Sequence, residues 1–140
     1  MSRWDTIIEN YESNDCESLG EYAFELLEEL MQYFENFESK ETSAKYAFYC
    51  AIYFADIDNF VDGGEEDVLR HALNDFNINT NFTLMQRNFR QYGYGRIVEQ
   101  LISDAPYRIR EIFARLGCAI CSGKGYVSEN ERRVILKWVK

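Results

Sequence analysis

Apolar residues recur along this chain with the three-to-four-residue spacing of an amphipathic α-helix. The longest such stripe follows Asp15, a typical N-cap residue, and continues to Phe37. No stretch alternates apolar and polar residues for long enough to indicate a β-strand. The pattern therefore predicts an all-α fold of seven or eight helices.

The other helices are predicted from the same spacing and from residues that start or stop a helix. Segment 42–57 is apolar on most sides, which indicates a central helix. Gly93 and Gly95 indicate a break or kink, and Pro106 favours a helix start because the first turn does not need its N–H. The Asn- and Thr-rich residues 77–81 indicate a loop. The predicted helices lie near residues 4–11, 15–37, 42–57, 62–76, 83–102, 104–122 and 128–138.

One internal repeat is visible, because residues 51–65 align without gaps on residues 117–131. Each copy contains the end of an apolar helix, a tight turn, an aromatic residue followed by valine, and a capping box that opens the next helix. Asn59 and Gly125 take equivalent positions, and both suit the left-handed conformation that often ends a helix. We expect two pseudo-repeated helical hairpins in a single compact bundle.

These hairpins resemble the tellurite-resistance TerB-like family of helical domains. The first copy carries Asp58 and Glu65 at the motif positions, and the second carries Lys124 and Glu131. The resemblance implies a helical core and, from the clustered acids of that family, a divalent-cation site formed by Asp58, Glu65 and Glu131. Lys124 stands where the second motif acid belongs, and its positive charge opposes a cation there.

Length and composition indicate one soluble domain. The chain has 140 residues with ten Tyr and ten Phe, which excludes a disordered chain. We interpret residues 1–140 as one domain, with an acidic helical part at 1–40 and the TerB-like core at 44–140. The longest apolar run has nine residues, too few to cross a membrane, and the N-terminus lacks a signal-peptide pattern, so we expect a cytoplasmic protein.

The charge is distributed unevenly along the chain. The net charge is −9, with −15 in residues 1–67 and +5 in residues 107–140, and an acidic chain is a poor binder of nucleic-acid phosphates. The second predicted helix carries glutamates with no lysine four residues on, a spacing at which like charges destabilise a helix. The candidate partner-binding acids are Glu21, Glu25, Glu28, Glu29, Glu35, Asp56, Asp58 and Asp62.

Three interpretations of this acidic helix remain open. The C-terminal arginines could neutralise it within the fold, a basic protein partner could bind it, or it could simply be solvated. The arginines in question are Arg108, Arg110, Arg115, Arg132 and Arg133.

Other residues with catalytic or metal-binding potential fit structural roles better. Cys118 and Cys121 have the spacing of a zinc or redox motif, but they align with interior helix positions of the first repeat, so we expect them to pack in the core. His71 has no neighbouring nucleophile pattern. The stretch 56–67 fails as a calcium loop because Phe60 takes a ligand position, although a weaker oxygen site remains open from Asp56, Asp58 and Asp62. We predict no enzyme and no cofactor.

The sequence therefore favours a non-catalytic binding protein whose acidic half covers a basic protein. Its most concrete form is an immunity protein that neutralises a basic toxin acting on nucleic acid, because opposite potentials speed association. The alternative is a TerB-like stress protein that binds a divalent cation. A weaker third option is a mimic of nucleic acid, with carboxylates in place of phosphates.

Overall fold

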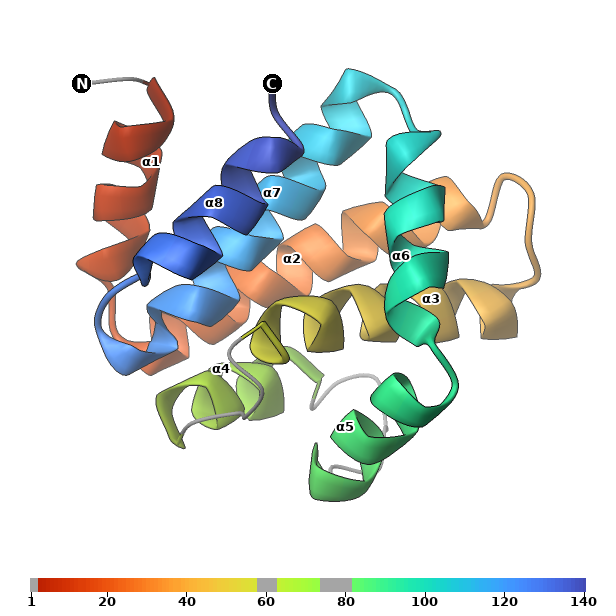
Figure 1. The fold of residues 1–140 in the computed structure, drawn as a ribbon, viewed down its shortest axis with the longest axis horizontal. Coiled ribbons are helices and arrows are strands. Elements are labelled where there is room, and N and C mark those ends of the chain that lie inside the picture. The colour runs from red at the N-terminus through yellow and green to blue at the C-terminus, as the bar shows by residue number, and fades with distance from the viewer. Residues whose placement is uncertain (1–2, 58–62, 74–81) are drawn as a thin grey trace.

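The computed structural model describes residues 3–57, 63–73 and 82–140, and these ranges form an all-α architecture (Figure 1). The predicted fold class is confirmed. Eight α-helices and one 3-10 turn follow one another in the described ranges. They are α1 (Arg3–Glu12), α2 (Cys16–Phe34), α3 (Lys40–Ala55), α4 (Gly63–Leu73), α5 (Phe82–Gln91), α6 (Tyr94–Ser103), α7 (Tyr107–Cys121), η2 (Ser122–Lys124) and α8 (Glu129–Lys137).

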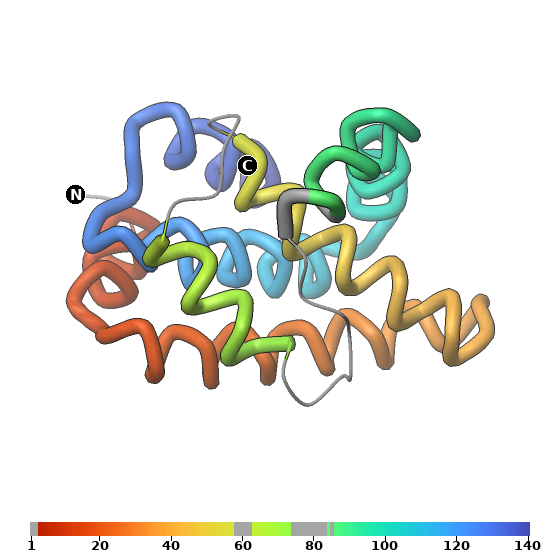
Figure 2. The backbone as a smooth tube through the Cα atoms, turned by 90° about the horizontal axis from the view of Figure 1, so that it is seen from below, coloured from red at the N-terminus to blue at the C-terminus, as the bar shows by residue number. Residues whose placement is uncertain are grey.

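The longest helix, α2, extends along one side of the molecule (Figure 2). The predicted cap is confirmed, because the Asp15 carboxylate accepts a hydrogen bond from the Ser18 N–H at 2.8 Å. The helix packs most extensively against α4, α7 and α3. It ends at Phe34, so the predicted stripe is three residues too long and Phe37 lies in the following turn. Its buried residues are Leu19, Gly20, Ala23, Leu27, Leu30 and Phe34.

The central position belongs to α7 rather than to α3. In α7, ten of fifteen residues are buried, because α1, α2, α3 and α8 all pack around it (Figure 1). In α3, seven of sixteen are buried, and rings such as Tyr49 and Tyr53 are only partly covered. The apolar character of segment 42–57 thus comes partly from aromatic residues at the surface.

The α3 and α7 helices approach closely where Gly117 faces Phe54. A Cβ atom at Gly117 would lie 2.5 Å from Phe54 Cε1. The Phe54 ring in turn packs on Phe113, with 4.6 Å between ring centroids. Glycine at this position therefore makes room for the aromatic layer between the two helices.

The second predicted hairpin forms as expected. Gly125 has the left-handed φ of 98° and ends η2, and Ser128 and Glu131 form the predicted capping box at the start of α8. In the first hairpin, Asn59 and Asp62 lie outside the described residues. The pseudo-repeat therefore stays a prediction.

Two predicted boundaries differ slightly from the structure. The break at Gly93 is confirmed, since this residue has φ of 67° between α5 and α6. Pro106, however, is the N-cap residue of α7 rather than a first-turn residue, and Asp104 is the C-cap of α6. Residues 74–81, which include the predicted loop 77–81, lie outside the described residues.

Replacing Gly117 with alanine should lower the free energy of unfolding by about 1–3 kcal/mol, because the added methyl needs space that the Phe54 ring holds. Denaturant unfolding followed by circular dichroism measures the change. The matched control is Gly95→Ala, where the nearest atom, Phe89 Cε1, is 3.5 Å away. That variant should be neutral or more stable by up to about 1 kcal/mol. Equal stability of the two variants would contradict the packing described for α3 and α7.

Candidate functional site

The acidic face of α2 lies opposite its buried face. Glu21, Glu25 and Glu29 are exposed and follow one another at four-residue spacing, which places their carboxylates in a row. Glu28 is half-buried on the flank of this row, and Glu35 is the exposed C-cap residue. The structure thus brings five of the predicted acids onto one helix surface, which we call the α2 acidic face.

The α2 acidic face has no counter-charge in the parts of the chain that the structure describes. No ion pair there joins any of its glutamates to a basic residue. Three of the five C-terminal arginines pair elsewhere: Arg115 lies 3.4 Å from Glu111, Arg132 pairs with Asp5 on α1, and Arg133 lies 4.0 Å from Glu129. Neutralisation of α2 by the C-terminal helices is therefore not found in these ranges.

Asp56, the one predicted aspartate that the structure describes, does not join this face. The Asp56 carboxylate accepts hydrogen bonds from Gln86 Nε2 at 2.6 Å and from Arg90 Nε at 2.8 Å, and only 16% of its side chain is exposed. Asp56 therefore holds α5 against the end of α3 and is already paired. Asp58 and Asp62 lie outside the described residues, so the structure places neither the partner contacts nor the oxygen site predicted for them.

A second group of predicted residues is buried where α4, α7 and α8 meet. Glu65, Cys121 and Glu131 place carboxylate and thiol atoms within 4.8 Å of one another. The two glutamates are 3% and 1% exposed. The structure thus brings together two residues of the metal site implied by the resemblance, and the third, Asp58, lies outside the described residues.

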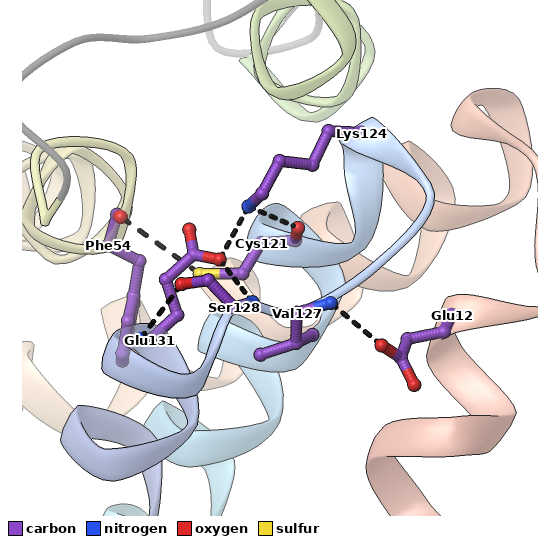
Figure 3. Close-up of polar contacts among 7 residues, drawn as sticks. All are labelled: Glu12, Phe54, Cys121, Lys124, Val127, Ser128 and Glu131. Carbon is purple, nitrogen blue, oxygen red and sulfur yellow. Dashed lines mark hydrogen bonds and ion pairs between the residues drawn. The ribbon is translucent and has the colours of Figure 1, made fainter.

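Lys124 adds a positive charge to this buried group (Figure 3). Its Nζ donates hydrogen bonds to Glu131 Oε1 and, at 3.2 Å, to the Cys121 carbonyl oxygen. Burial alone would lower the pKa of Lys124, but the bond to Glu131 and the charge of Glu65 outweigh it and raise the pKa above its usual value. The ammonium therefore stays charged at neutral pH and offsets the charge of the carboxylates.

Backbone contacts fix the position of Glu131. Its Oε1 accepts a hydrogen bond from the Ser128 N–H at 2.9 Å, while Ser128 Oγ accepts one from the Glu131 N–H at 3.1 Å. In the same turn, the Val127 N–H donates to Glu12 Oε2 at 2.7 Å, which attaches α1 to the α7–α8 hairpin (Figure 3). Glu131 therefore caps α8 and forms an ion pair at the same time.

The two cysteines of the predicted zinc-like spacing lie in the core, so the packing prediction is confirmed. Burial raises the pKa of the Cys118 thiol to about 12 and raises that of Cys121 well above its usual value. Both therefore remain thiols at neutral pH, whereas nucleophiles and metal ligands need the thiolate. His71 is exposed on α4, and its Cβ lies close to the backbone of Gly20 on α2.

The sequence patterns did not predict two features of the structure, the surroundings of Cys121 and the exposure of Phe37. The repeat aligns Cys121 with Ala55, an apolar position, and this gave no signal that Cys121 touches the two glutamates. Phe37 was predicted within the buried stripe, but it is 52% exposed. The polar neighbours Asn36 and Glu38 were a usable signal that the helix had already ended.

Comparison with known proteins assigns no relative to this chain. No family model matches it, and neither a curated protein nor a solved structure does. Within residues 3–57, 63–73 and 82–140, no helix combines the length and apolarity needed to cross a membrane.

Replacing Lys124 with methionine should lower the free energy of unfolding by about 3 kcal/mol, because Glu131 would remain buried without its counter-charge. Lys137→Met is the matched control, since Lys137 pairs with Glu99 at the surface, where 55% and 41% of the two side chains are exposed. It should cost less than about 1 kcal/mol. Similar losses in both variants, measured by denaturant unfolding, would show that the buried pair has no special role.

Divalent cations should bind the wild-type protein weakly, because Lys124 already neutralises the carboxylates that a metal would need. Titration calorimetry with calcium, magnesium, manganese and zinc should give no micromolar binding. Micromolar affinity that disappears in Asp58→Ala or Glu131→Gln would overturn this expectation and would favour the TerB-like alternative.

Proposed function

We propose that this protein is a non-catalytic cytoplasmic binding module whose α2 acidic face binds a basic protein. The observation that carries the proposal is the row of exposed glutamates that no base neutralises in the described part of the chain. Its most concrete form is an immunity protein that neutralises a toxin acting on nucleic acid. Such a toxin presents a basic surface because it must bind phosphates.

Electrostatics supports this interpretation. Like charges at four-residue spacing each cost a helix roughly 0.2–0.5 kcal/mol. A basic partner removes that repulsion on binding. The net charge of −9 adds a long-range attraction that speeds association with a cationic protein.

An aromatic side chain beside the glutamates supports a protein partner rather than a diffuse ion atmosphere. Tyr22 is 41% exposed between Glu21 and Glu25. Its ring packs edge-on against Tyr11, with 6.0 Å between centroids, so its position is fixed by α1. Exposed, rigid aromatic rings supply the apolar contact that charge alone does not give an interface.

The second candidate function is that of a TerB-like protein binding a divalent cation. The convergence of Glu65, Cys121 and Glu131 favours it. The ammonium of Lys124 and the protonated thiol of Cys121 oppose it, because both disfavour a metal in the same space. We therefore place this function second.

Reversing the charge of Glu25 should leave the free protein as stable as before or more stable by a few tenths of a kcal/mol. A lysine there would pair with Glu21 and Glu29, four residues away on either side. The gain should be larger at low salt, where screening is weakest. Thermal unfolding of the wild type and Glu25→Lys at two ionic strengths measures it.

Glu111→Lys is the control for this prediction. Glu111 lies 2.7 Å from Arg3 and 3.4 Å from Arg115, so its reversal should lower stability, most of all at low salt. A low-salt loss in Glu25→Lys similar to that in Glu111→Lys would mean that α2 is neutralised within the fold. The proposed binding surface would then be wrong.

Recovery of the native complex tests the function itself. Wild-type protein purified from its own cells should retain a basic protein that the triple variant Glu21→Lys, Glu25→Lys, Glu28→Lys does not retain. The recovered protein should cleave or modify nucleic acid, and the wild type should inhibit it. A partner that binds the triple variant equally well would contradict the proposal.

A further inference from the structure

A groove of about 350 Å³ lies between the turn that follows α2 and helix α6. Its lining consists of the apolar side chains of Phe37, Ile97 and Leu101 and the polar side chains of Gln100 and Asp104. Phe37 is 52% exposed and Ile97 is 38% exposed, which makes this an apolar surface of large side chains. Exposed apolar surface of this kind is typical of an interaction site.

The groove is held in shape by aromatic packing. The Phe37 ring lies edge-on to the ring of Tyr33, with 5.5 Å between centroids, and edge-on to Phe34 at 6.2 Å. Phe34 is fully buried in the core. Tyr33 and Phe34 therefore hold the Phe37 ring in place while about half of its surface stays exposed. A ligand that binds this ring does not have to pay the entropy cost of fixing its position.

Several exposed carboxylates lie close to the groove along the chain. Two helices end here, with Glu35 as the C-cap of α2 and Asp104 as the C-cap of α6, and neither helix has a base in its last turn. The exposed carboxylates of Glu35, Glu38 and Asp104 therefore make this region acidic. None of these three carboxylates forms an ion pair with a described residue.

We propose that this groove receives an apolar side chain of the basic partner, carried on a segment whose neighbouring residues are lysine or arginine. The inference rests on the proposed function and names the partner chemistry at one end of the α2 acidic face. A second copy of this chain is disfavoured as the occupant, because two such negative surfaces repel each other. The two surfaces contribute differently to binding. The charges of the glutamate row raise the association rate, and the apolar side chain buried in the groove lowers the dissociation rate.

Two synthetic peptides probe the groove. One is a 15-residue lysine-rich peptide with leucines at helical i, i+3, i+4 and i+7 spacing, and the other has serine in place of each leucine. At low salt, both should bind the acidic protein, and the leucine peptide should bind about tenfold more tightly. Calorimetry gives the affinities, and backbone amide shifts in NMR spectra locate the leucine-dependent contact at Phe37 and Ile97.

Phe37→Ser and Ile97→Ser should each remove most of the tenfold preference and leave the serine peptide unaffected. The matched control is Tyr126→Ser, since Tyr126 is 58% exposed on the distant α7–α8 turn (Figure 1). Circular dichroism and thermal unfolding verify that each variant is folded. Two groove variants are used, so that a folding defect in one leaves the other as the test.

The outcomes separate this inference from the proposed function. Equal affinity for both peptides, or an unchanged preference in both groove variants, overturns the inference that the groove binds an apolar side chain. Neither result contradicts the proposal that the α2 acidic face binds a basic protein. If neither peptide binds, the proposed function itself is wrong. Sedimentation that shows a wild-type dimer dissociated by Phe37→Ser would assign the groove to a second copy and would also overturn the inference.

Discussion

The amphipathic division of α2 is the constraint on which the rest of this structure depends. One face of the helix is continuously buried against α4, α7 and α3. The fit is close at Gly20, where a Cβ atom would lie 2.2 Å from the Cβ of His71 on α4. Rotating the helix to hide its glutamates would expose Leu19, Leu27 and Leu30, each fully or almost fully buried. Core packing therefore forces the opposite face, with its row of carboxylates, into solvent.

The same physical chemistry separates the two groups of acids in this protein. Glu131 is buried, and the fold supplies it with Lys124 and a backbone N–H. Glu21 and Glu25 are exposed and have no such partner in the described residues. A buried carboxylate needs a partner within the chain, because leaving it unpaired costs several kcal/mol of folding free energy. Exposed carboxylates are solvated by water, so the free protein folds without a partner for them. This difference is why the acidic face of α2, rather than the buried cluster, carries the proposed function.

Much of the fold was predictable from the sequence, because it depends on local signals. Asp15 and Ser128 were identified as caps from residue type and spacing, and Gly93 as a break. What was not predictable depends on tertiary contacts. The backbone approach of Gly64 and Gly123, where a Cβ atom on Gly64 would lie 2.1 Å from Gly123 O, leaves no periodic signal in the sequence.

In the candidate site, too, local sequence signals predict some features, and tertiary contacts determine the others. The exposure of Glu21, Glu25 and Glu29 follows from helical spacing opposite an apolar stripe, so periodicity predicts it. Pairing does not follow from periodicity. The contact of Asp56 with Arg90, 34 residues away, required the folded chain.

Carboxyl footprinting of the native complex tests the central claim most directly. Free protein and the complex with its recovered basic partner are treated with a carbodiimide and an amine, and the modified residues are identified by mass spectrometry. We predict that Glu21, Glu25 and Glu29 react in the free protein and are protected in the complex, while the buried Glu131 is unreactive in both. Glutamates of α2 that react equally in both states would contradict the account.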